Sequence, residues 1–438
     1  MEKPNILYIH SHDTGRYIQP YGYPVHTPNL QKFAEEGVLF RQAYCASPTC
    51  SPSRASLLTG QYAHNSGMLG LAHRGFTLTD YSHHIIHTLR SAGYISALAG
   101  MQHIANAFEV PWKTIGYDIF LGDTSAVDDH TGDLAAPFLR AALDFLDHPP
   151  SQPFFLSLGF EETHRKYPPL HPGLNPGYTL PPAPLPDTAE VREDMTRYKI
   201  SAQNLDRKMG TVFDTLQRNG LAENTLVICT TDHGIAFPGM KCNLTGHGIG
   251  VMLMVRGPGG FSGGKVLDSL VSHIDIYPTI CDLINIPYPD WLQGISFMPV
   301  VRGEIKETRD AIFAEVNYHA AYEPMRCIRT KRWSYIRRFE VLPHPILPNC
   351  DDSLSKSLWM EYGWRELPPA PEALYDLIFD PNESNNLIDH PKVSDFVFEM
   401  RERLDEWMQS TQDPLLQGHV PAPPGAILNN REGISPTE

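Results

Sequence analysis

Residues 5–15 of the chain read Asn-Ile-Leu-Tyr-Ile-His-Ser-His-Asp-Thr-Gly. The part from Ile6 to Ile9 is a short apolar run rich in strand-forming residues, and a polar cluster follows it at once. This order is typical of a buried parallel strand that ends in a loop. Similar apolar runs, each followed by polar residues, recur at residues 95–99, 154–158 and 225–231.

Helical patterns lie between these runs. The clearest stops at Asn219-Gly220, and its apolar face consists of Tyr198, Leu205, Met209, Val212, Phe213 and Leu216. Strands that alternate with helices predict an α/β fold with a large, mostly parallel central sheet and helices on both faces. In such a sheet, functional residues are expected at the C-terminal ends of the strands. Residues 168–186 are crowded with proline, which predicts a long surface loop.

The pattern changes after about residue 303. Residues 329–337 alternate like an antiparallel strand, and an amphipathic helix is predicted from Ser394 to Trp407. We therefore predict a catalytic domain at residues 1–305. A smaller C-terminal subdomain at residues 306–438 is expected to contain a short antiparallel sheet, a helix and a tail that wraps or frays.

The composition of the 438 residues narrows the function classes. Hydrophobic residues make up 42% and charged residues 19%, which is ordinary for a globular protein. The formal charge of -15 makes the chain a poor candidate for binding nucleic acid or an anionic membrane. No segment approaches the ~20 apolar residues of a membrane span, and no secretion signal opens the chain, so we expect a cytoplasmic protein. The seven cysteines lack C-x-x-C spacing, which argues against a disulfide framework or a structural zinc site.

Residues 50–60 form the most informative motif, Cys-Ser-Pro-Ser-Arg-Ala-Ser-Leu-Leu-Thr-Gly. It resembles the signature of the type I sulfatase family, whose members have an alkaline-phosphatase-like fold. The resemblance implies that a separate formylglycine-generating maturation enzyme oxidises Cys50 to formylglycine. One hydroxyl of the aldehyde hydrate would attack sulfur, and the other, once deprotonated, would expel sulfate. Arg54, one helical turn further on, is expected to hold the hydrate.

The same resemblance implies a metal site. Sulfatases place two aspartates after the first strand, where this chain has His12-Asp13, and Asp-Asn after a later strand, where it has Asp232-His233. His12, Asp13, Asp232, His233 and the Cys50-derived group are therefore the expected ligands of one divalent metal ion. Ca²⁺ is the usual sulfatase metal and takes oxygen ligands. Imidazole suits Mn²⁺ or Zn²⁺ better, so the identity of the metal stays open.

Two segments resemble the family's acid–base residues. Residues 100–103, Gly-Met-Gln-His, are similar to the family's G-K-x-H segment. His103 keeps the position of the base that deprotonates the second hydroxyl, but Met101 replaces a lysine that binds sulfate. His164 is expected to protonate or hydrogen-bond the leaving group, and Arg165 is a nearby alternative anion binder.

Two further residues, Lys241 and His247, follow the Asp232-His233 pair and complete the expected site. Lys241 stands where the family has a lysine or arginine that touches the sulfate. His247 follows in a glycine-rich loop, within reach of the same site. Within the family, the chain looks most like N-sulfoglucosamine sulfohydrolases, on the motif at residues 50–60 and on residues 65–68, 234–238 and 286–289.

These features predict a hydrolase of sulfate esters or sulfamates. Its substrate would be a small sulfated sugar or aryl compound, and the protein could form a homo-oligomer. His233 and the missing lysine leave open a phosphonate monoester or phosphodiester hydrolase on the same scaffold. A third hypothesis is a catalytically inactive binding homologue, for which Met101 and His12 would be the marks of decay.

Overall fold

The computed structural model describes residues 3–106, 110–122 and 136–437. Its centre is a mostly parallel sheet of eight strands in the order β4-β3-β5-β1-β6-β7-β2-β8. The strands are β1 (Asn5–Ser11), β2 (Val38–Tyr44), β3 (Ile95–Gly100), β4 (Ile119–Phe120), β5 (Phe154–Gly159), β6 (Thr225–Thr231), β7 (Leu253–Arg256) and β8 (Lys265–Ser272). Only β7 runs antiparallel to its neighbours β6 and β2. The predicted fold class and the four predicted strands are confirmed.

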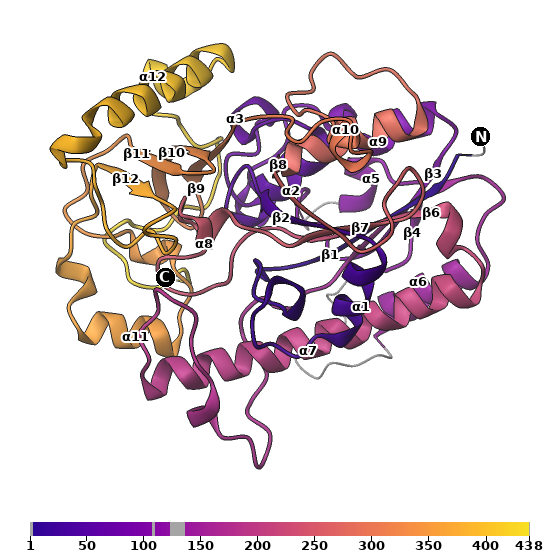
Figure 1. Ribbon diagram of the computed structural model, residues 1–438, viewed down its shortest axis with the longest axis horizontal. Coiled ribbons are helices and arrows are strands. Elements are labelled where there is room, and N and C mark those ends of the chain that lie inside the picture. The colour runs from indigo at the N-terminus through magenta and orange to yellow at the C-terminus, as the bar shows by residue number, and fades with distance from the viewer. Residues whose placement is uncertain (1–2, 107–109, 123–135, 438) are drawn as a thin grey trace.

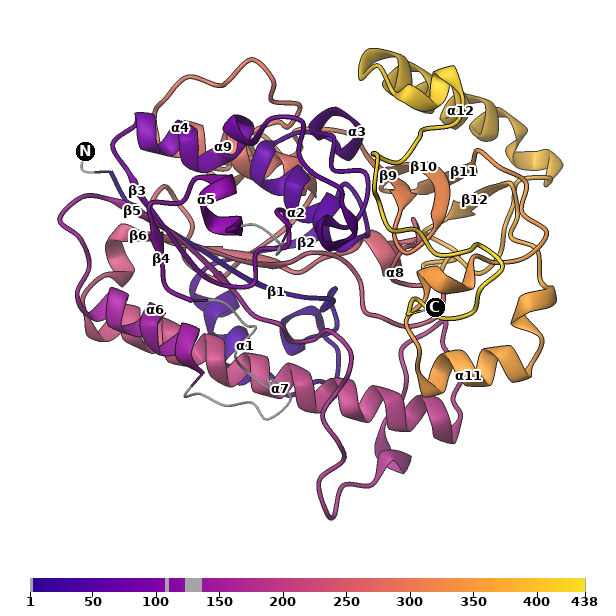
Figure 2. The same ribbon diagram turned by 180° about the vertical axis from the view of Figure 1, so that it is seen from behind.

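Helices cover both faces of this sheet (Figures 1 and 2). One face packs on α1 (Pro28–Glu36), α6 (Pro137–Asp147) and α7 (Ala189–Arg218), and the other on α2 (Cys50–Thr59), α4 (Ile85–Ser91) and α9 (Ile276–Ile284). The side chains of β1 alternate accordingly: Leu7 and Ile9 join the first core, and Ile6 and Tyr8 join the second. Shorter helices are α3 (Ala63–Ser66), α5 (Pro111–Ile115), α8 (Gly246–Ile249) and α10 (Met298–Val301).

The C-terminal region has its own antiparallel sheet, in the order β12-β11-β10-β9. Its strands are β9 (Ala311–Tyr318), β10 (Tyr322–Thr330), β11 (Trp333–Arg338) and β12 (Glu372–Asp376), and its helices are α11 (Leu354–Glu361) and α12 (Ser394–Ser410). The prediction of one strand over residues 329–337 was wrong at its start. The chain turns at the charged pair Lys331-Arg332 and forms a hairpin between β10 and β11. The sequence did not reveal this turn, because the alternating pattern continues through a turn of only two residues.

Two predicted irregular segments are confirmed. Residues 168–186 carry only a short turn, Pro176–Tyr178, and project below the body of the molecule in Figure 1. The tail wraps rather than frays, since the amides of Ile427 and Asn429 donate to the carbonyls of Arg74 and Ala320. All seven cysteines are free. In the described part of the chain, no helix combines the length and the apolar character that a bilayer crossing requires. The domain boundary at residue 305 stays a prediction.

Candidate active site

The order of the strands explains why residues far apart in sequence meet. Strands β3, β5, β1 and β6 are neighbours and run parallel, so their C-terminal ends lie at the same edge of the sheet. His12 and Asp13 follow β1, and Asp232 and His233 follow β6. His103 and His164 are carried by the loops that follow β3 and β5. The expected convergence at the strand ends is therefore what the sheet produces.

Five side chains gather into one buried cluster at this edge. Each of His12, Asp13, Cys50, Asp232 and His233 offers a ligand atom, and these atoms all lie within 4.8 Å of one another. They are the five residues that the sequence predicted as metal ligands. Two carboxylates, two imidazoles and one sulfur atom in so small a volume form a donor set that can hold a divalent cation.

The His233 ring is oriented as a metal-bound imidazole would be. Its Nδ1 lies 3.0 Å from the carbonyl oxygen of Gly234. Its Nε2 lies 3.3 Å from Oδ1 of Asp13 and 3.4 Å from Sγ of Cys50. A ligating histidine usually donates its second ring N–H to a carbonyl or carboxylate in this way, which leaves the other nitrogen free to bind the ion.

Asp13 and Asp232 are held by the backbone. Oδ1 of Asp232 accepts from the amide of Asp13 at 2.8 Å and from the amide of His233 at 2.9 Å. Asp13 has a φ of 54°, a left-handed conformation that non-glycine residues seldom adopt. The turn after β1 therefore keeps the Asp13 carboxylate facing the cluster.

The electrostatics of the cluster favour a positive charge at its centre. Burial alone would raise the pKa of Asp13, but Lys241 and His12 hold it well below its usual value. Burial alone would lower the pKa of His233, but Asp232 and Asp13 raise it to about 8. Carboxylates that stabilise a proton on a neighbouring ring also stabilise a metal ion, since both interactions are with a cation.

Cys50 occupies the first turn of α2, at the positive end of the helix dipole. The helix is tied to the sheet by Arg54, which is 2% exposed. Its guanidinium donates to Oδ2 of Asp232 and to the carbonyl of Ser11, both at 3.0 Å. Burial would raise the pKa of the Cys50 thiol, but Lys241, His12 and His233 lower it well below its usual value. The positive charge around Cys50 therefore outweighs the effect of burial on its thiol.

Lys241 lies between two carboxylates. Its Nζ is 2.9 Å from Oδ2 of Asp13 and 3.1 Å from Oδ2 of Asp351. The nearby Lys241 ammonium outweighs the effect of burial and holds the pKa of Asp351 at about 2. Sequence reasoning missed Asp351, which lies in the C-terminal region outside the matched motifs. It keeps the lysine charged and aimed at the cluster.

Three histidines line the remaining side of the cluster. Nε2 of His103 is 2.8 Å from Nδ1 of His73, and burial lowers the pKa of His103 to about 4. Nε2 of His164 is 4.0 Å from Oδ2 of Asp13. His319, at the end of β9, is buried and interacts with Cys50. Neither His73 nor His319 was singled out from the sequence, because neither belongs to a motif with a known spacing.

A family model described as Sulfatase matches residues 4–286. The chain belongs to the sulfatase family. A second model, described as N-sulphoglucosamine sulphohydrolase, C-terminal, matches residues 241–344. The protein is accordingly a hydrolase of sulfate esters or sulfamates, as the sequence predicted, and the family match does not favour the phosphonate alternative.

Similar proteins extend over nearly the whole chain of this sulfatase. N-sulphoglucosamine sulphohydrolase from Homo sapiens is 28% identical, over 94% of this chain and 89% of its own. A choline-sulfatase from Rhizobium meliloti is 26% identical, over 89% and 83% respectively. A solved structure of a 2-O GAG sulfatase has a TM-score of 0.75 at 21% identity and covers 98% of this chain and 96% of its own. That last likeness shows the fold.

Two predicted substrate-binding residues lie outside the cluster of the sulfatase. The guanidinium of Arg165 makes two bonds to Asp194, at 2.7 and 2.9 Å, and lies over the rings of Tyr167 and Phe237. The ring of His247 contacts the hydroxyl of Tyr17 at 2.8 Å and the carbonyl of residue 382. The structure therefore gives both side chains partners within the protein, and their contact with substrate stays a prediction.

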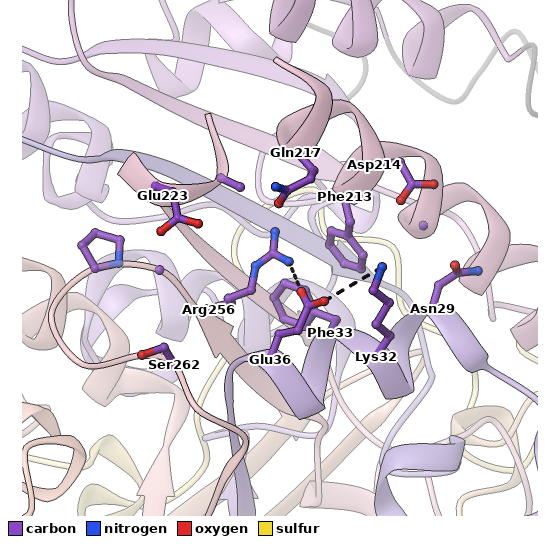
Figure 3. A pocket seen from close by; sticks show the side chains of 14 residues that line it. Asn29, Lys32, Phe33, Glu36, Phe213, Asp214, Gln217, Glu223, Arg256 and Ser262 are labelled. Atoms are coloured by element: carbon purple, nitrogen blue, oxygen red, sulfur yellow. Dashed lines mark hydrogen bonds and ion pairs between the residues drawn. The ribbon is translucent and has the colours of Figure 1, made fainter. Parts of the chain in front are cut away.

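A surface pocket of about 480 Å³ lies away from this site (Figure 3). It is formed by α1, the end of α7 and the loop after β7, and no residue of the cluster lines it. Its two cationic side chains both pair with Glu36, Arg256 at 2.5 Å and Lys32 at 3.9 Å, and Arg256 also stacks on Phe33. The chemistry of the sulfatase is therefore located at the strand ends and not in this pocket.

Proposed function

We propose that this sulfatase hydrolyses a small sulfated sugar, either a sulfate ester or a sulfamate, with a formylglycine derived from Cys50 as nucleophile. The observation that carries the proposal is the position of Cys50, at the start of α2 and inside the buried cluster of His12, Asp13, Asp232 and His233. A sugar substrate is supported by the relative from Homo sapiens, whose printed name is N-sulphoglucosamine sulphohydrolase.

Each neighbouring side chain has a task that its geometry supports. The converted Cys50 would supply an aldehyde hydrate, and a divalent ion held by the five cluster residues would supply positive charge beside it. Arg54 holds the carboxylate of Asp232 and the start of α2 in place. Lys241 offers an ammonium group to the sulfate. His103, whose lowered pKa keeps its ring neutral, accepts a proton, and His164 donates one to the leaving group.

The donor set bears on the identity of the metal. Ca²⁺, which is the family expectation, prefers oxygen ligands, and the cluster offers carboxylate oxygens from Asp13 and Asp232. His12 and His233 add two ring nitrogens, which favour Mn²⁺ or Zn²⁺. Anomalous scattering from crystals grown with Ca²⁺, Mn²⁺ and Zn²⁺ together would identify the element that binds. Density for Ca²⁺ alone would contradict the preference for nitrogen-binding metals.

Three further features belong to the same proposal. A formylglycine-generating maturation enzyme is the required partner, because Cys50 cannot oxidise itself to an aldehyde. A cytoplasmic location and a homo-oligomeric state stay proposals of the sequence. Fractionation of the source cells tests the first, and light scattering of the purified protein tests the second.

The decisive experiment combines mass spectrometry with substrate comparison. Protein produced together with an active maturation enzyme should show the aldehyde mass on the Cys50 peptide. It should hydrolyse 4-nitrophenyl sulfate or N-sulfoglucosamine faster than an aryl phosphonate diester. A free thiol after co-expression, or a faster rate on the phosphonate, would overturn the proposal.

A further inference from the structure

His73 and His103 form a pair of rings at the edge of the active site. Nδ1 of His73 lies 2.8 Å from Nε2 of His103, and the ring centroids are 5.0 Å apart at an interplanar angle of 17°. The second nitrogen of His103, Nδ1, is buried, and Cys50 is the side chain that interacts with this ring on the side of the cluster. Cys50 is close enough to this ring to act on its pKa. One nitrogen of His103 is thus engaged by His73, and the other is left for the Cys50 group.

The backbone holds His73 firmly in this place. His73 is the middle residue of a single turn, Ala72–Arg74. On one side, the amide of Ala72 donates to Oγ of Ser51, the residue next to Cys50, at 2.9 Å. On the other side, Arg74 donates to Oδ1 of Asn429 at 2.6 Å and to the carbonyl of residue 436 at 2.7 Å. The turn is therefore anchored both to the nucleophile helix and to the C-terminal tail.

The His103 side of the pair is fixed as well. His103 has a φ of 55°, a conformation that turns its side chain sharply out of the loop after β3. Oε1 of Gln102 accepts from the amides of Ile104 and Ala105 at 2.7 and 2.9 Å, which closes the loop behind the ring. Because both backbones are held, the contact between the rings is a built feature and not a chance approach of two mobile side chains.

We propose that His73 is a positioning residue that sets the tautomer of His103, so that an unprotonated Nδ1 faces the Cys50-derived group. The inference rests on the proposed function, in which His103 is the base. His73 is exposed to solvent. A neutral, hydrated imidazole favours the form with hydrogen on Nε2, which leaves Nδ1 of His73 as an acceptor. His103 then donates from Nε2, and its own Nδ1 carries the lone pair that a base requires.

The tautomer can be measured without a working enzyme. In Cys50→Ala protein, which cannot be converted, ¹⁵N-detected NMR of the imidazole rings should show His103 protonated at Nε2 and bare at Nδ1. Adding His73→Ala should weaken this preference and raise the share of the form with hydrogen on Nδ1. An unchanged His103 signal in the double variant would overturn the proposal, whatever the fate of the proposed function.

Kinetics of the converted enzyme separate positioning from a structural role. His73→Ala should lower kcat by about tenfold to a hundredfold with little change in KM, and added imidazole should restore part of the rate. His73→Asn should retain most of the activity, because its Oδ1 stands where Nδ1 stood and accepts the same hydrogen bond. His83→Ala is the matched control, since His83 also lies in a short turn and stacks on another ring, that of Trp291.

The outcomes are distinct. Equal losses in His73→Ala and His73→Asn, without rescue by imidazole, would show a packing role and overturn the proposal. A rate equal to the parent in His73→Ala would do the same. If the converted parent hydrolyses no sulfated compound, the proposed function fails, and the NMR result still decides whether His73 sets the tautomer.

Discussion

Replacing Arg165 with methionine distinguishes a structural arginine from a substrate-binding one. The Arg165 side chain is 9% exposed and that of Asp194 is 3% exposed, and the pair makes two bonds of 2.7 and 2.9 Å. After the change, Asp194 would keep only the hydroxyl of Ser355, at 2.6 Å, as a side-chain donor among the contacts that the structure describes. Removing one partner of a buried pair leaves an uncompensated charge, which costs about 3–5 kcal/mol.

Two assays test this magnitude. Urea unfolding followed by tryptophan fluorescence should show a free energy of unfolding lower by about 3–5 kcal/mol in Arg165→Met. The KM of the converted enzyme should stay within about threefold of the parent, since the guanidinium already has its partners in the protein. Arg218→Met is the matched control: its side chain is 61% exposed and meets Asp147 at 3.2 Å, so the change should cost less than about 1 kcal/mol.

A double variant sharpens the argument. Asp194→Leu in the Arg165→Met background removes the stranded charge and should recover part of the lost stability, because an apolar pair avoids the desolvation penalty of two ions. The reasoning would be refuted if Arg165→Met unfolded at the parent's midpoint while KM rose more than about tenfold. That result would show that Arg165 binds substrate, as the sequence suggested.

Three further changes test the site and the fold. Cys50→Ala should abolish turnover and leave circular dichroism unchanged; residual activity within about tenfold of the parent would contradict its role. Asp232→Asn should weaken metal binding and lower the rate together, and calorimetry with unchanged Mn²⁺ affinity would remove Asp232 from the ligand set. Buried Glu315, whose pKa His64 and Arg326 lower to about 2 against the effect of burial, contributes stability above pH 4.5 that is lost as pH falls toward 2. Acid titration of the unfolding free energy should therefore show a loss over that window that is about 3 kcal/mol smaller in Glu315→Gln than in the parent.

The sequence predicted the central sheet well because its signal is local. Each buried strand is a short apolar run followed by polar residues, and β1 and β6 show this pattern without interruption. The metal ligands were predicted from the resemblance to sulfatases, and the strand pattern explains why they meet, because parallel strands end at one edge of the sheet. No knowledge of distances was needed to expect that residues after β1 and β6 would meet.

The missed residues reach the site by tertiary packing alone. His319 follows β9 of the smaller sheet, and Asp351 lies in the segment before α11. His73 belongs to a single turn whose place is set by its bonds to Ser51 and to the tail. None of these positions has a periodic pattern or a fixed spacing from a motif, and His319 and Asp351 reach the site only because the C-terminal region packs against the large sheet.

Arg165 illustrates a contact that the sequence does not show. A cationic residue beside a site that binds an anion is a natural candidate for substrate contact. The sequence cannot show that Asp194, on the long helix α7, points at the same place. Because a buried arginine is stable only when its donors are satisfied, the partner within the protein decides where its guanidinium is directed.

The charged side chains of the active site surround a position for a cation. Three carboxylates, those of Asp13, Asp232 and Asp351, face the two cationic side chains Arg54 and Lys241. The lysine that sulfatases use to bind sulfate is Met101 in this chain. Asp232 and Asp13 raise the pKa of His233 to about 8 against the effect of burial, so this ring adds positive charge when no metal is bound. A divalent ion bound by the cluster would take the place of that proton, and it would supply positive charge to an anionic substrate where the lysine is missing.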